Sequence, residues 1–168
     1  LELPVSGGRV PVDVSRDIIK VAAIERVYQP GKTFVGFIRG LGLRRGAIAT
    51  SVGWDSSDMI VVGVDEADMA RAVNRVAELG GGIIVCAGGK ILAEIALPIA
   101  GMISELPIET ISQRLRHIQQ EAANLGLAWP DLRQTLCTLT SAAIPFLRIC
   151  EAGLVDVKQN RFVDLIVD

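Results

Sequence analysis

Two apolar runs of strand length, separated by a short polar loop, constrain the fold of this 168-residue chain more than any other feature. The runs cover residues 47–52 and 59–64, and both are rich in small and β-branched apolar side chains. Runs of this length with polar boundaries are typical of buried strands. A connection this short favours neighbouring antiparallel strands. The pattern therefore predicts two buried neighbouring strands that hold a polar loop at one edge of a sheet.

Composition favours a domain that mixes helices and strands. Half of the residues are hydrophobic but only 4% are aromatic, so the core must be built from Val, Ile, Leu and Ala. Such a core suits a sheet covered by helices, and the length fits one domain. We predict an α+β fold, with a mixed, largely antiparallel sheet and packed helices in one domain at 18–168. Residues 1–17 are expected to form an irregular lead-in or a short edge strand.

Charge and apolar run length exclude two classes of partner. The 19 acidic and 17 basic residues nearly balance, so no strong field favours nucleic acid or an anionic membrane. No apolar run reaches the roughly 18 residues that span a bilayer, and the N-terminus lacks the basic flank and long apolar core typical of a signal peptide. Cys86, Cys137 and Cys150 are interpreted as reduced core thiols, which favours the cytoplasm. Because the chain begins at Leu1, we expect a piece of a longer protein.

Local patterns predict the remaining elements. Residues 18–27 form a β-branched run of strand length, and 33–38 are interpreted as a second strand or a short helix. A helix is predicted from the N-cap Asp65 to about Leu79, where Gly80-Gly81-Gly82 ends it, and a hairpin of 83–87 and 90–95 is predicted around Gly88-Gly89. A loop or short helix at 97–106 is followed by a long helix from Pro107 to Gly126. The rest is predicted to form short helical and extended pieces at 127–150 and one or two strands at 153–168.

A cluster of glycines precedes the first apolar run. Gly40-Leu41-Gly42 followed by Gly46 has a superficial likeness to a phosphate-binding loop. The spacing is not G-x-G-x-x-G, and the residues that follow are strand-like, so no helix N-terminus is available for a phosphate. We interpret these residues as tight-turn glycines.

Histidine content restricts the catalytic options. The chain has one histidine, His117, which lies in the predicted long helix beside the apolar stripe. A zinc centre needs several ligands at suitable spacing, and a Ser-His-Asp triad would have to use this single residue without a G-x-S-x-G turn. We therefore predict no metal site in this chain and assign no catalytic residue.

The polar loop is the candidate site. Asp55 and Asp58 could serve as a general base or as metal carboxylates, and the serines could orient a small ligand. The alternative is an Asx-type turn in which Asp and Ser cap backbone groups. Trp54 adds weight to binding, since a large amphipathic ring in a polar loop often packs on a ligand or partner. The ligand-binding or site-closing candidates are Ser51, Trp54, Asp55, Ser56, Ser57 and Asp58.

Several blocks of this sequence, in the same order, resemble the C-terminal domain of bacterial and archaeal adenine deaminases. The resemblance covers most of the chain from Ile18 onward. Its blocks are the run from Gly36 to Val52, Asp55-Ser56, 60–63, Gly80-Gly81-Gly82, 97–102, 153–157 and 162–165.

The resemblance implies a larger enzyme. An amidohydrolase-type barrel that binds divalent metal (Mn or Fe) would precede this domain and hydrolyse adenine to hypoxanthine and ammonia. This chain would then be an accessory domain that is inactive alone and whose partner is the N-terminal barrel. Whether the protein also forms a homo-oligomer is left open. We hypothesise that the metal-bound hydroxide attacks purine C6 in the barrel. The loop from Ser51 to Asp58 would close the site or hold the domain interface.

The sequence also departs from the family pattern. The resemblance implies histidines where Val27, Trp54 and Ser57 stand, and an amide in place of Asp58. Asp55-Ser56 matches, so a positioning role carries over most directly to that pair. The departures favour an alternative, in which the domain is a non-catalytic interaction module or a small-ligand-binding module.

Overall fold

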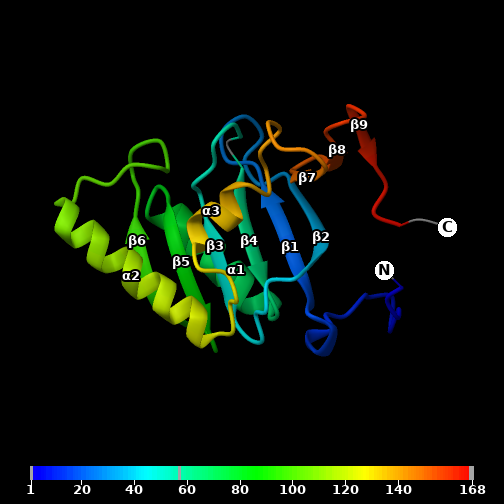
Figure 1. The fold of residues 1–168 in the computed structure, drawn as a ribbon, viewed down its shortest axis with the longest axis horizontal. Coiled ribbons are helices and arrows are strands. Elements are labelled where there is room, and N and C mark those ends of the chain that lie inside the picture. The colour runs from blue at the N-terminus through cyan, green and yellow to red at the C-terminus, as the bar shows by residue number, and fades with distance from the viewer. Residues whose placement is uncertain (1, 57, 167–168) are drawn as a thin grey trace.

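The computed structural model describes residues 2–56 and 58–166, and its main body is a six-stranded sheet (Figure 1). The strand order is β2-β1-β4-β3-β5-β6, and every pairing between these strands is antiparallel. The α+β prediction is confirmed. The strands are β1 (Ile18–Ile24), β2 (Thr33–Arg39), β3 (Ala47–Thr50), β4 (Met59–Gly63), β5 (Gly82–Ala87) and β6 (Lys90–Ala96).

Helices cover both faces of this sheet (Figure 1). On one face, α1 (Glu66–Glu78) buries Met69, Ala72 and Val76 against apolar side chains of the central strands. On the other face lie α2 (Ile108–Asn124) and α3 (Leu132–Cys137), with further core residues beneath them. Because successive side chains of a strand point to opposite faces, strands buried on both sides need apolar residues throughout. All positions of β3 and β4 are accordingly buried.

The start of α1 explains both its own position and that of the neighbouring hairpin. Asp65 caps the helix by accepting a hydrogen bond from the Asp68 backbone N–H at 2.9 Å, as predicted. The Asp68 side chain, in the first turn of α1, is buried. It accepts bonds from the backbone N–H groups of Gly88 (2.9 Å) and Gly89 (2.7 Å). The first turn of α1 therefore holds the tip of the β5–β6 hairpin.

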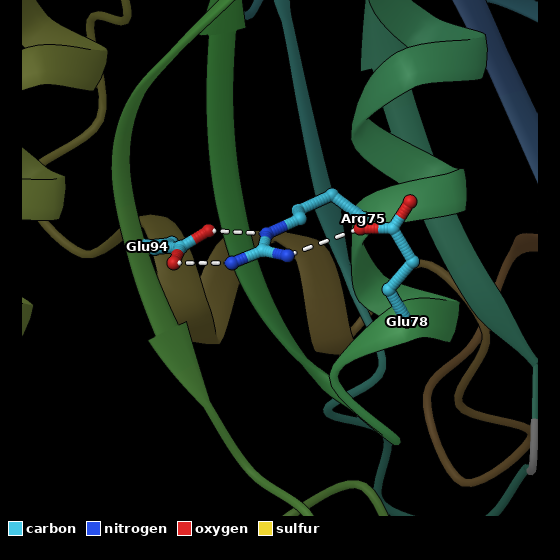
Figure 2. Close-up of polar contacts among 3 residues, drawn as sticks. All are labelled: Arg75, Glu78 and Glu94. Atoms are coloured by element: carbon cyan, nitrogen blue, oxygen red, sulfur yellow. Dashed lines mark hydrogen bonds and ion pairs between the residues drawn. The ribbon is translucent and has the colours of Figure 1, made fainter.

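An ion pair holds the other end of α1 against the edge strand β6. Figure 2 shows the Arg75 guanidinium reaching across to the Glu94 carboxylate, with Nε–Oε2 and Nη2–Oε1 distances of 2.8 and 2.9 Å. Arg75 also donates to Glu78 in its own helix at 3.0 Å. The hydrogen bonds from Arg75 hold the pKa of the Glu94 carboxyl below its usual value. A two-bond pair of this geometry is the stronger kind of ion pair.

The tight-turn interpretation of the glycine cluster is confirmed. Gly40, Gly42 and Gly46 have φ angles of 98°, 78° and 71°, in the region that favours glycine, and a strand follows them. At Gly42 the backbone also passes close to Gly126, such that a Cβ on Gly126 would lie 2.6 Å from the Gly42 carbonyl oxygen. Both glycines are therefore needed for a close approach of two backbones.

The C-terminal part adds a second, smaller sheet. Its strands are β7 (Leu147–Cys150), β8 (Gly153–Asp156) and β9 (Arg161–Val163), and they pair antiparallel in that order. One or two strands were predicted at 153–168, and both β8 and β9 lie there. Ile149 enters the main core, and Leu154 packs against it, which anchors this sheet beside β1.

The N-terminal lead-in is irregular. Apart from isolated bridges, it contains the short 3-10 helix η1 (Val14–Arg16), capped by Asp13. Among the residues that the structure describes, no helix has the length and apolar character required to cross a membrane.

Candidate functional site

Four loops meet at one end of the main sheet, and we call this region the loop end (Figure 1). They are the β1–β2 turn (25–32), the β3–β4 loop (51–58), the β6–α2 connection (97–107) and the α3–β7 connection (138–146). Since β3 and β4 are central strands, the 51–58 loop extends from the middle of the sheet. The two predicted strands are buried, antiparallel neighbours, and the polar loop joins them where they end.

Hydrogen bonds between the loops fix the loop end. Arg26 Nη2 donates to the carbonyl oxygen of Ala100 at 2.8 Å, which joins the β1–β2 turn to the β6–α2 connection. The Ser141 hydroxyl donates to Asp55 Oδ2 at 3.1 Å, which joins the α3–β7 connection to the β3–β4 loop. The loops are thus held by one another as well as by their strands.

Ser51 is fully engaged inside the protein. It is 1% exposed, and its hydroxyl donates to the Gly101 carbonyl at 2.7 Å while it accepts from the Gly82 backbone N–H at 2.8 Å. The hydroxyl therefore joins the end of β3 to the start of β5 and to the β6–α2 connection. A ligand role for Ser51 stays a prediction.

The middle of the loop combines turn-like bonding with an exposed ring. Besides its bond from Ser141, Asp55 accepts from the Ala143 backbone N–H at 3.3 Å, and Ser56 Oγ accepts from the Asp58 backbone N–H at 3.3 Å. Trp54 is 59% exposed, and its indole N–H donates to no group within the described residues. The candidate Ser57 lies outside the residues that the structure describes.

A cavity of about 410 Å³ brings three of the candidates together. Asp55, Ser56 and Asp58 line it, whereas Ser51 lines a separate cavity of about 220 Å³. The cavity of about 410 Å³, which we call the acidic cavity, is also lined by Glu25, Tyr28, Gln29, Cys150 and Glu151. The structure thus joins residues from the β1–β2 turn, the β3–β4 loop and the β7–β8 turn.

Asp58 has an unfavourable electrostatic environment. Its side chain is almost fully buried, and this burial raises the pKa of its carboxyl. The negative charges of Glu151 and, less strongly, Glu25 raise this pKa further, while Lys32 acts in the opposite direction. Lys32 is itself engaged, with its Nζ 3.4 Å from Glu151 Oε1. The acidic cavity therefore holds more carboxylate than cationic charge.

The lining defines what the acidic cavity can bind. Carboxylates accept hydrogen bonds and attract cations, so the cavity suits a basic side chain or a group rich in N–H donors. Among the described residues, no three His, Cys, Asp or Glu side chains are placed to hold a metal ion. A role for Asp55 and Asp58 as metal carboxylates or as a general base stays a prediction.

Sequence reasoning named three of the eight residues that line this cavity and missed the other five. Glu25 is the first charged residue after the apolar run of β1. The 51–58 loop was selected by the same kind of pattern, in which polar residues follow an apolar run of strand length. Glu25 is buried and accepts from the backbone N–H groups of Val27 and Gln29. Glu151 stands in the short turn between β7 and β8 and carried no local signal. Its position beside Asp58 depends on the tertiary fold.

His117 and the cysteines lie outside the acidic cavity, apart from Cys150. His117 is exposed on α2, as expected, and lines a different cavity beside the edge strand β6. All three cysteines are free, and Cys86 and Cys137 are buried. Burial raises the pKa of the Cys86 thiol to about 11, with a further contribution from Asp68. Such thiols are poor nucleophiles at neutral pH.

Comparison with known families identifies the domain. The family model of the adenine deaminase C-terminal domain matches residues 1–161. This chain belongs to that family. The resemblance predicted from the 36–52 run and its companion blocks is confirmed, and the match also includes the lead-in before Ile18.

Relatives of this adenine deaminase C-terminal domain are much longer proteins. Adenine deaminase of Kosmotoga olearia is 46% identical over 167 residues, which cover 99% of this chain and 29% of the relative. Adenine deaminase of Methylobacterium nodulans is 47% identical over 163 residues, covering 97% and 29%. Adenine deaminase 1 of Rhizobium meliloti is 48% identical over 161 residues, covering 96% and 28%. The chain thus spans less than a third of these relatives.

Proposed function

We propose that this domain is the C-terminal accessory part of an adenine deaminase-like hydrolase. The parent reaction is hydrolysis of adenine to hypoxanthine and ammonia, which breaks a C–N bond of a cyclic amidine. The proposal rests on the family match over residues 1–161, and relatives named adenine deaminase support it at 46–48% identity. The parent would then act in purine metabolism in the cytoplasm.

Catalysis and accessory functions would be divided between two parts of the parent. A divalent metal, Mn or Fe, would be held by the N-terminal barrel and would supply activated water there. The described residues of this chain contain no group that fits a metal, so its own contribution would be to position groups and exclude water. We therefore expect this chain to be inactive when produced alone.

The 51–58 loop is suited to close a site or hold a domain interface. Asp55 Oδ2 is fixed by Ser141 and Ala143, which limits motion of the loop. Within the described residues, no hydrogen bond reaches the other oxygen of Asp55, so that oxygen can accept one from substrate or from the preceding part. A fixed acceptor loses little entropy when it binds. In this proposal, Asp55 therefore holds the substrate or the preceding part of the parent in position when the site is closed.

The test is a matched pair of substitutions in the parent protein, which includes the upstream region. Asp55→Ala should lower kcat/KM for adenine by about tenfold or more, because small losses of positioning have effects of this size. Asp131→Ala is the control, since Asp131 also accepts a backbone N–H bond, from Gln134 at 2.9 Å, but lies at the start of α3. Asp131→Ala should change kcat/KM less than about twofold. Equal kinetics for both variants would contradict the positioning role.

The alternative is a non-catalytic interaction or small-ligand-binding module. Val27, Trp54 and Ser57 stand where the family resemblance implies histidines, which favours a parent with altered activity. Assay of the parent with added Mn²⁺ or Fe²⁺ against adenine and related amino-purines separates the two functions. A well-folded parent that deaminates none of these compounds would support the module.

A further inference from the structure

Six large apolar side chains are exposed on three of the four loops of the loop end. Each is between 46% and 86% exposed. Single exposed apolar residues are ordinary, but a group of them on adjoining loops marks an interaction surface. We call this group the loop surface: Val27, Tyr28, Trp54, Ile99, Met102 and Ile103.

The loop surface is held in one arrangement before any partner binds. Arg26 joins the turn that carries Tyr28 to the connection that carries Met102 through its bond to Ala100. Ser51 joins the loop that carries Trp54 to the same connection through Gly101. A Cβ on Gly101 would lie 2.4 Å from the Arg26 guanidinium, so the two segments are in close contact. An interface organised in advance loses little entropy on binding.

Other exposed apolar groups have explanations that do not involve the parent. The Lys158 ammonium lies over the Phe146 ring, 4.5 Å from its centroid, in a cation–π contact within this chain. Phe162, Leu165 and Ile166 lie in β9 and the residues after it, and none of them belongs to the four loops of the loop end. Trp129 is 49% exposed, but its indole N–H donates to the Gly40 carbonyl at 2.7 Å. Trp54 has no such bond within the described residues.

We propose that the loop surface docks on the preceding part of the same parent chain. This inference rests on the proposed function, and it names the docking face that the function requires. The relatives extend this chain by more than twice its own length, so a large segment is available to cover the surface. Because the adjacent acidic cavity is lined by the carboxylates of Asp55, Asp58 and Glu151, the covering surface is apolar opposite Trp54 and basic opposite the cavity.

Hydroxyl-radical footprinting of the intact parent tests the docking face without any substitution. The rate of oxidation of each side chain is measured in the folded parent and divided by its rate in the unfolded chain. Trp54, Tyr28 and Met102 should react at least threefold more slowly than Trp129 after this correction. Trp129 is the matched control because its exposed fraction, 49%, is close to the 59% and 47% of Trp54 and Met102.

The other outcomes overturn the proposal. A difference of less than threefold would show that the loop surface is no better covered than the Trp129 side. Protection that disappears when the parent is diluted to a monomer would assign the surface to a second copy. A deaminase assay on the same sample keeps the two proposals separate. An active parent with an exposed Trp54 would refute only the docking face, and a protected Trp54 in an inactive parent would refute only the function.

Discussion

The two tryptophans of this chain are exposed to similar extents, yet they belong to regions with different roles. Trp129 lies in the connection between α2 and α3, where its indole is bonded to Gly40. Neighbouring backbone bonds complete this contact, among them Ala128 N–H to the Leu41 carbonyl at 3.0 Å and Arg44 N–H to the Leu125 carbonyl at 2.9 Å. Trp54 lies in the loop surface, and no bond within the described residues holds its ring.

This comparison shows that exposed area alone does not distinguish a structural side chain from an interface side chain. The hydrogen bond of Trp129 is part of the fold, so the position of its ring is explained without a binding partner. The hydrogen bonds at the loop end hold the loops to one another, whereas the rings of Trp54 and Tyr28 are exposed to solvent. The fold therefore explains the Trp129 region completely and the loop surface only in part.

The largest expected effect concerns the backbone contact behind Trp129. Gly126→Ala should lower the free energy of unfolding of this chain by about 3 kcal/mol, since the φ of 109° is strained for alanine. Its Cβ would also meet the Gly42 carbonyl oxygen at 2.6 Å. Denaturant unfolding measures this change. Gly88→Ala is the control, because Gly88 has a φ of 59° and open space, so it should lose only about 1 kcal/mol. Equal losses would mean that the two backbones do not meet.

The next effect separates the tryptophans directly. Trp129→Ser removes a packed ring and its hydrogen bond, so this chain should lose about 2 kcal/mol of unfolding free energy. Trp54→Ser should change that free energy by less than about 0.5 kcal/mol, as expected of an exposed side chain. In the parent, Trp54→Ser should lower the melting temperature of the docked domain. A Trp54→Ser variant that is as unstable as Trp129→Ser in this chain would remove the distinction between the regions.

The smallest effect concerns the buried charge at the loop end. The folded protein raises the pKa of Asp58 above its ordinary 3.8, so folding favours the protonated carboxyl. The stability that this group contributes is therefore fully present below pH 3.8 and is lost as the pH rises through the folded-state pKa. Asp58→Asn should make this chain more stable at pH 7 by about 1 kcal/mol.

The pH dependence provides the check on that prediction. The advantage of Asp58→Asn in thermal unfolding should shrink as the pH falls, and should vanish below the ordinary pKa, where Asp58 is neutral in both states. If the difference in stability between the Asp58→Asn variant and the unchanged chain does not vary with pH, the charge of Asp58 is not the cause of that difference. A stabilising change of this kind is expected where a site is arranged for binding rather than for stability.

Local elements were predictable where neighbouring residues decide them. Asp65 caps a helix through a hydrogen bond three residues away, and Gly88-Gly89 closes a two-residue hairpin, so both could be inferred from sequence. Contacts between distant residues were not predictable in this way. The carboxylate of Asp68 holds the hairpin tip, 20 residues on, and no local pattern indicated it.

The candidate site was predicted in part, for the same reason. Asp55, Ser56 and Asp58 share one cavity because they share one loop. Glu25 and Glu151 join them only because β1 pairs with β4 and because the small sheet packs beside β1. The inward orientation of Ser51 depends on Gly82 and Gly101, which are 31 and 50 residues away.

The sequence by itself determined that this chain forms strands, helices and a polar loop between two buried strands, and that it belongs with the C-terminal domains of adenine deaminases. Short-range periodicity, caps and turn residues contain the structural information, and the blocks that resemble the family indicate the membership. Only the tertiary structure decided which loops meet and that the acidic cavity gathers carboxylates from the β1–β2 turn, the β3–β4 loop and the β7–β8 turn. It also decided that the Trp54 indole N–H has no hydrogen-bond partner among the described residues. These properties follow from long-range strand pairing, which places residues far apart in the chain side by side and which no local pattern specifies.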